Sequence, residues 1–215
     1  LAGSTMRFPE HRTIQKPKPI KISEILIHPS FRFLYLAMFT GLAAGFAVNA
    51  NLKELFLGGE SGVQIGITGV SLFALANATG RIVWGVVFDK VQSSTAVKAN
   101  LLLQASVLLA APYMLHSTAG FLCFALFTGF NYGGVLVIYV ASASRCWGAD
   151  RVSQIYGWLF SSNILASFSP IMAGFVFDTY HTFTYALFGL AALLIGCSAT
   201  IHRKAYFIDM DSSTR

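Results

Sequence analysis

Six long apolar segments, each nearly free of charged residues, limit what this 215-residue chain can fold into. They cover roughly residues 31–52, 63–88, 97–115, 119–143, 153–177 and 182–202. Each is about as long as the ~17–25 residues that a helix needs to cross the hydrocarbon core of a bilayer. None shows the strict alternation of a membrane β-barrel, and helices satisfy their own backbone hydrogen bonds in lipid. The segments predict an all-α membrane protein with a bundle of six transmembrane helices.

The composition supports this fold class and excludes an ordinary soluble domain. Charged residues make up 11% of the chain and hydrophobic residues 55%, whereas a soluble domain carries about 25% charged residues. The net charge of +6 lies in the connections between apolar segments and does not gather on one face. We therefore expect the bilayer to be a partner of this chain, and we expect no nucleic acid partner.

The basic residues predict how the six helices are oriented. If residues 1–30 lie in the cytoplasm, 13 of the 15 Lys and Arg residues fall in cytoplasmic segments, as the positive-inside rule requires. The exceptions are Lys53, on the outside, and Arg81, within a span. This pattern predicts a cytoplasmic linker over 1–30, a cytoplasmic tail over 203–215 and a location in the plasma (inner) membrane. Within the linker, residues 21–28 suit either a short amphipathic turn on the membrane surface or an ordinary loop.

Arg81 is the most informative residue, because it lies about 10 Å inside the second span, seven residues from its end. A charge at this depth is costly and usually faces a cavity or a partner. Asn77 lies one helical turn earlier, on the same face. A guanidinium binds a carboxylate through two parallel hydrogen bonds, so Arg81 and Asn77 are candidate ligands for an anion. The alternative is an arginine that extends to the inner interface.

Other polar residues within the spans are weaker candidates. Asn131, Tyr139 and Asn163 could line a polar cavity together with Arg81. Each could instead form a hydrogen bond between helices, which for a single residue is the commoner role. The chain shows no nucleophile–base pair, no phosphate-binding loop and no metal-ligand cluster. We therefore expect no enzyme activity, no cofactor and no metal site.

One stretch resembles a known family signature. Residues 80–90, which include Arg81, Trp84, Asp89 and Lys90, resemble the loop motif that recurs in the second half of major facilitator superfamily transporters. The chain is most similar to the oxalate/formate antiporter-like branch, which is related to monocarboxylate porters. Further matching positions cover about residues 20–200: Glu24, Pro29, Phe31, Tyr132-Gly133-Gly134, Trp147-Gly148, Tyr156-Gly157, Pro170, Gly174 and Asp178.

The resemblance implies a twelve-helix transporter, of which this chain would supply helices seven to twelve, with an N-terminal six-helix half missing from the sequence. It implies the exchange of small organic anions by alternating access, with Arg81 as the anion-binding arginine. The branch's second cationic group, a lysine in the eleventh helix, aligns with Asn163. With one positive charge left at the site, a monocarboxylate is expected as substrate rather than the dicarboxylate oxalate. Asp89 and Lys90, with Arg145 and Arg151, are the expected cytoplasmic gate.

Two other readings remain open. The chain could belong to a major facilitator transporter of another solute class, in which Arg81 is structural. It could also be a six-helix membrane protein that acts through interactions and does not transport.

Overall fold

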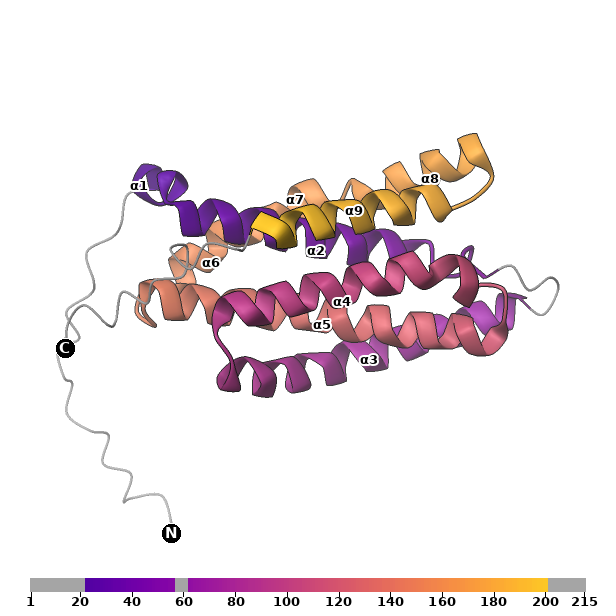
Figure 1. Ribbon diagram of the computed structural model, residues 1–215, viewed down its shortest axis with the longest axis horizontal. Helices are drawn as coiled ribbons and strands as arrows, with labels where there is room; N and C mark the ends of the chain where they lie inside the picture. Colours follow the sequence, from indigo (N-terminus) through magenta and orange to yellow (C-terminus); the bar gives the residue numbers. More distant parts are fainter. Residues whose placement is uncertain (1–21, 57–61, 201–215) are drawn as a thin grey trace, which may run out of the picture.

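The computed structural model describes residues 22–56 and 62–200, and within these ranges every regular element is an α-helix. The long helices run roughly along one common axis (Figure 1). The helices are α1 (Ile22–Ile27), α2 (Pro29–Ala50), α3 (Gly62–Lys90), α4 (Ser93–Met114), α5 (Thr118–Trp147), α6 (Val152–Phe160), α7 (Ser162–Ala166), α8 (Ser169–Tyr180) and α9 (Thr184–Thr200).

The helices agree with a membrane bundle. Five segments are long and apolar enough to cross a bilayer: α2, α3, α4, α5 and the combined segment Val152–Tyr180. The sixth predicted span, 182–202, corresponds to α9, which has 17 described residues and is shorter than the other five. The chain is thus an integral membrane helical bundle, and the count of six spans stays a prediction.

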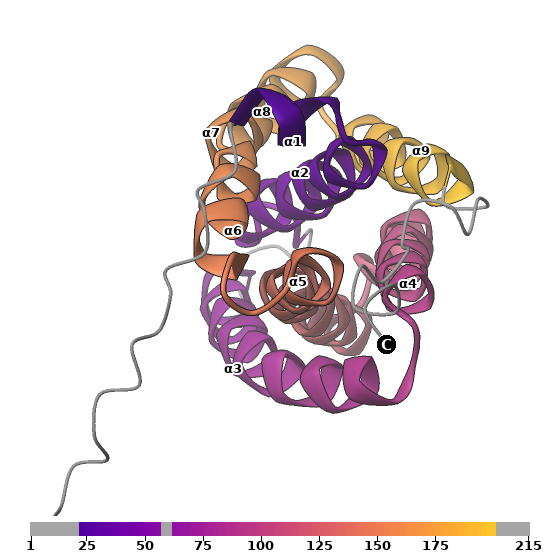
Figure 2. The same ribbon diagram turned by 90° about the vertical axis from the view of Figure 1, so that its left-hand side faces the viewer.

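The helices are not equally buried within the chain. Seen end-on, α5 lies in the middle of the bundle, with α2, α3, α4 and α6 around it (Figure 2). In the most apolar part of α2, 72% of the residues are buried, against 22% in α3 and 22% in Val152–Tyr180. The outer faces of α3 and of the α6–α8 segment are therefore free to meet lipid or another protein segment.

Glycines bring α3 and α5 into close contact. A Cβ atom at Gly80 would collide with the Phe130 carbonyl, and one at Gly129 would collide with the Phe73 carbonyl. A Cβ atom at Gly133 would collide with the carbonyl oxygen of Asn77. The Gly129–Gly133 pair therefore works as the small-residue contact that its spacing indicates. This contact fixes the register of the two parallel helices and sets the Asn77 turn of α3 beside Gly133.

The fifth predicted span, 153–177, is interrupted. The structure divides this crossing into α6, α7 and α8, with breaks near Ser161 and Ser167. At the breaks Ser161 donates its hydroxyl to the Trp158 carbonyl at 2.7 Å, and Ser167 donates to the Ile164 carbonyl at 2.7 Å. Such side chains compete with the helical ladder, and Pro170 further removes a backbone donor. One continuous helix is therefore replaced by three short ones.

The start of the described chain packs onto α2. Helix α1 falls within the predicted 21–28 turn, with Ile25 buried and Leu26 and Ile27 exposed. The ring of His28, which follows α1, lies 5.8 Å from that of Trp147 at the end of α5. The linker before residue 22 and the predicted tail 203–215 lie outside the described residues.

Candidate functional site

Arg81 and Asn77 lie together on α3, as their spacing predicts. Arg81 Nε donates a hydrogen bond to Asn77 Oδ1 at 3.1 Å. Arg81 is exposed and Asn77 is half-buried. Within the described part of the chain this is the only hydrogen bond of the guanidinium, so its two terminal nitrogens remain available. The pair presents a positively charged donor group on the uncovered face of a transmembrane helix.

Two tyrosines from other helices accompany Arg81. Tyr132 on α5 and Tyr156 on α6 each lie within electrostatic range of the guanidinium and of each other. The Tyr132 ring lies 5.9 Å from those of Phe46 and Phe73. The Tyr156 hydroxyl donates to the Leu136 carbonyl over 3.4 Å. We refer to Asn77, Arg81, Tyr132 and Tyr156 as the Arg81 cluster.

The family resemblance includes both tyrosines but implies no role for either. The signal that could have found Tyr132 is its position next to Gly133, since Gly133 contacts the turn of α3 between Asn77 and Arg81. No comparable sequence signal points to Tyr156, because its place depends on how α6 packs against α5.

The structure does not bring Asn163 into the Arg81 cluster. Asn163 lies on α7, and its Nδ2 donates to the Phe160 carbonyl at 3.0 Å. The side chain is half-buried and helps to form the break between α6 and α7. It lies on the same membrane crossing as Tyr156, seven positions further along.

Asn131 and Tyr139 lie inside the bundle. Both are fully buried, and neither side chain has a hydrogen-bond partner among the described residues. The backbone carbonyl of Asn131 accepts a bond from Asn100 on α4 at 3.0 Å. Tyr139 lies near Cys197 on α9. In this conformation neither side chain joins the Arg81 cluster.

At the C-terminal end of α3, Arg145 binds the helix terminus. Its guanidinium nitrogens donate to the carbonyls of Phe88 at 2.8 Å and Val91 at 2.7 Å. Phe88 lies in the last turn of α3 and Val91 directly follows it. A cation at this end also complements the helix dipole. Arg145 thereby joins the α3–α4 connection to the end of α5.

The remaining predicted gate residues lie nearby in the chain. Asp89 and Lys90 are exposed in the last turn of α3, and Arg151 is half-buried directly before α6. The α3–α4 and α5–α6 connections lie at the same end of the bundle (Figure 1). The four residues therefore share one end, which the charge pattern predicts to be cytoplasmic.

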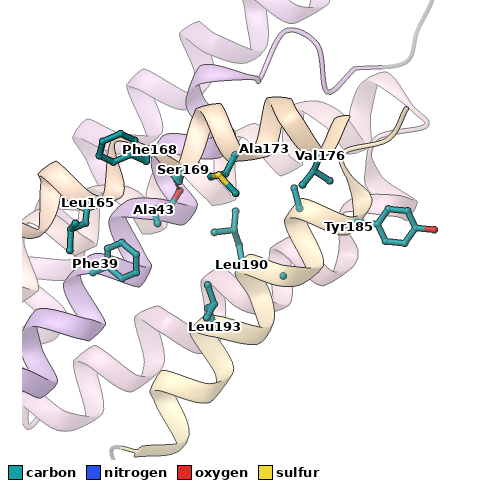
Figure 3. Close-up of a pocket in the computed structure, with 13 residues that line it drawn as sticks. Phe39, Ala43, Leu165, Phe168, Ser169, Ala173, Val176, Tyr185, Leu190 and Leu193 are labelled. Carbon is teal, nitrogen blue, oxygen red and sulfur yellow. Dashed lines mark hydrogen bonds between the residues drawn. The ribbon is translucent and has the colours of Figure 1, made fainter. Parts of the chain in front are cut away.

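A separate pocket of about 440 Å³ lies between α2, α7, α8 and α9 (Figure 3). Its lining is almost entirely apolar and includes Phe39, Phe168 and Leu190. Within the pocket, the Ser169 hydroxyl already donates a hydrogen bond to the Ala43 carbonyl at 2.7 Å. The pocket contains no cation, so it does not suit an anion.

The chain is similar to two proteins of named function. It is 26% identical over 172 residues to apicoplast pyruvate carrier 1 of Toxoplasma gondii, a match that covers 78% of this chain and 29% of the carrier. It is 33% identical over 108 residues to the probable L-galactonate transporter of Escherichia coli (strain K12), with 41% of this chain and 23% of that protein covered. No protein-family profile matches. The chain spans less than a third of either relative, and the similarities support a transporter family.

Proposed function

We propose that this chain is the C-terminal six-helix half of a major facilitator transporter that carries a small monocarboxylate by alternating access. The observation that carries the proposal is the Arg81–Asn77 pair on the uncovered face of α3. Arg81 lies nine residues from the end of α3, which is ~14 Å along the helix. A guanidinium at this depth needs a partner of opposite charge.

A carboxylate is the anion that this pair fits best. The planar guanidinium can give two parallel hydrogen bonds to the two oxygens of one carboxylate. Asn77 fixes Nε and so limits the directions that the other two nitrogens can take. Arg81 is the only basic residue of α3 before Lys90 at its end, so one negative charge balances the site.

The two relatives support one carboxylate over two. Pyruvate and L-galactonate, which their names specify, each carry a single carboxylate. Oxalate carries two, and the family resemblance aligns Asn163 with the second cation of the oxalate-transporting branch. A monocarboxylate is therefore the proposed substrate, exchanged for another anion.

The N-terminal half is the proposed partner of the α3 and α6–α8 faces. These two segments are the least buried of the five long crossings. They also flank the Arg81 cluster, so a second bundle placed against them would enclose the cluster. Rocking of the two halves about the enclosed site would then expose it to each side in turn. Asn163, Tyr139 and Asn131 remain candidates for substrate contacts in other conformations of that cycle.

The proposed cytoplasmic gate comprises Asp89, Lys90, Arg145 and Arg151. In the structure, Arg145 binds carbonyl oxygens rather than a carboxylate. Asp89 is therefore free to pair with Arg151 or with the other half when the inner side closes. Pairs of this kind are partly solvated and act by biasing two states.

Counterflow of labelled formate, lactate, pyruvate and oxalate into proteoliposomes tests the proposal, with this chain joined to its N-terminal half. We expect monocarboxylate uptake that is lost in Arg81→Gln and kept in Arg32→Gln, which alters an exposed arginine at the start of α2. Carboxylate uptake that persists in Arg81→Gln would show that Arg81 is structural. Uptake of none of the four acids would refute the anion proposal.

A further inference from the structure

We infer that the hydroxyls of Tyr132 and Tyr156 form the second half of the Arg81 site and select 2-oxo and 2-hydroxy monocarboxylates over acids that lack this oxygen. The inference rests on the proposed function, because it assumes that Arg81 binds a carboxylate. It adds the chemical class of the substrate and two residues that determine specificity.

The helix packing places Tyr132 at the depth of Arg81. A Cβ atom at Gly133 would lie 3.1 Å from the backbone nitrogen of Arg81, so the two residues belong to facing turns of α3 and α5. Tyr132 precedes Gly133 and lies within electrostatic range of the guanidinium. The phenol and the guanidinium can therefore contact different oxygens of one small molecule.

The Tyr132 ring is held in place while its hydroxyl stays available. The ring packs over Gly45, where a Cβ atom would collide with it, and against Phe46 and Phe73. Among the described residues its hydroxyl has no hydrogen-bond partner. A fixed ring with a free donor can bind a ligand without a large cost in side-chain entropy.

Tyr156 approaches from a third helix. Its hydroxyl reaches the carbonyl of Leu136, one turn along α5 from Tyr132. The contact of 3.4 Å is longer than a good O–H···O bond of about 2.7 Å, so a closer acceptor would replace it readily. The Tyr156 ring also borders an open space of about 410 Å³ between α5 and α6. Arg81 and Tyr132 do not line this space, but the two phenols and Arg81 come from three helices and lie within electrostatic range of one another.

The chemistry of this arrangement matches a carboxylate with an oxygen on the adjacent carbon. Arg81 would hold the carboxylate. A phenol would donate a hydrogen bond to the 2-oxo oxygen, or form a hydrogen bond with a 2-hydroxyl group as donor or acceptor. A site with fixed polar groups discriminates strongly against an analogue that leaves them unpaired. Propionate has the carbon chain of pyruvate without the 2-oxo group, so it is the natural comparison.

The experiment measures the apparent affinities for pyruvate and propionate by counterflow, with this chain joined to its N-terminal half. We expect the wild type to prefer pyruvate. Tyr132→Phe and Tyr156→Phe should each reduce that preference about threefold to tenfold, by lost pyruvate affinity with propionate unchanged. The double variant should bring the two acids close to parity. Tyr113→Phe, which alters an exposed phenol near the end of α4, is the control.

Three results would overturn the inference: no pyruvate preference in the wild type, an unchanged preference in both single variants, or an equal loss of both acids, which indicates a structural role. Arg81→Gln separates this inference from the proposed function. If Arg81→Gln loses both acids while the tyrosine variants keep the preference, only the tyrosine assignment fails. If Arg81→Gln transports both acids normally, the carboxylate site itself fails.

Discussion

The guanidinium carbon of Arg145 on α5 lies 4.0 Å from the centroid of the Phe88 ring on α3. The same guanidinium donates to the Phe88 carbonyl, so it contacts both the ring and the backbone of one residue. A cation–π contact and a charged hydrogen bond therefore both join Arg145 of α5 to Phe88, in the last turn of α3.

Replacement of Arg145 by Gln should loosen this end of the bundle. The change removes the cation over the ring and two charged hydrogen bonds, for a destabilisation of about 2 kcal/mol. Thermal unfolding in detergent measures the effect. Arg145→Lys should recover only part of it, because an ammonium lacks the planar fork that reaches both carbonyls. Arg151→Gln is the control, and an unfolding temperature unchanged in Arg145→Gln would contradict the assignment.

The gate proposal predicts a rescue by charge exchange. Arg145 is already engaged with carbonyls, so Arg151 is the expected partner of Asp89. Asp89→Arg and Arg151→Asp should each slow transport by up to about fivefold, the range of a partly solvated pair. The double variant should return the rate toward that of the wild type. Transport that stays as slow in the double variant as in the single variants would exclude this pair.

The contact between α3 and α5 predicts a strict requirement at Gly133. A methyl group there meets the Asn77 backbone, which cannot move as a flexible side chain could. Gly133→Ala should cost about 1–3 kcal/mol through overpacking, and it should also disturb Arg81. Gly196→Ala is the matched control, since a Cβ atom at Gly196 meets nothing within 4 Å. Equal unfolding temperatures for the two variants would show that α3 and α5 separate at little cost.

Asn77 offers a test of charge at the proposed site. Asn77→Asp places a carboxylate where Oδ1 now accepts from Arg81 Nε. This internal anion would compete with the substrate, so we expect transport to fall as far as in Arg81→Gln. Asn77→Ala removes only the positioning bond and should raise the apparent KM about threefold to tenfold. Counterflow kinetics distinguish the two, and an active Asn77→Asp variant would argue against a carboxylate substrate.

Tyr139→Phe tests whether a buried phenol reaches the substrate during the cycle. In the structure described its hydroxyl is fully buried and has no partner among the described residues. An unpaired buried hydroxyl costs stability, so its removal should be neutral or stabilising by about 1 kcal/mol. Because Tyr139 is a proposed substrate contact in another conformation, transport should fall about threefold to tenfold while stability is kept. Transport within about twofold of the wild type would remove Tyr139 from the candidate contacts.

The sequence predicted the helical class and the Arg81–Asn77 pair because both depend on short-range rules. The length of an apolar segment indicates a membrane helix, and residues four apart share a helix face. Which face of each helix lies inside was harder to predict. These helices are apolar nearly all round, and such a pattern does not identify the buried side. The sequence therefore predicts Asn131 and Tyr139 beside Arg81, whereas the structure places them inside the bundle.

The interruption of the crossing Val152–Tyr180 was not predicted for a related reason. Serine is tolerated in membrane helices, and its hydroxyl commonly bonds a carbonyl of the preceding turn without ending the helix. Several such bonds close together, followed by Pro170, change the outcome. The cumulative effect depends on local geometry that the residue types alone do not specify.

The interruption also gives this crossing uneven stiffness. Helix α8 is fastened to α2 by the bond from Ser169 to the Ala43 carbonyl, whereas α6 carries Tyr156 on the far side of two breaks. At each break a hydroxyl already occupies a carbonyl that a straight helix would need. Bending there therefore sacrifices few backbone bonds. The α6 and α8 ends of the crossing can therefore change their angle at the breaks while Ile155 and Leu159 stay buried and Ser169 keeps its bond to α2.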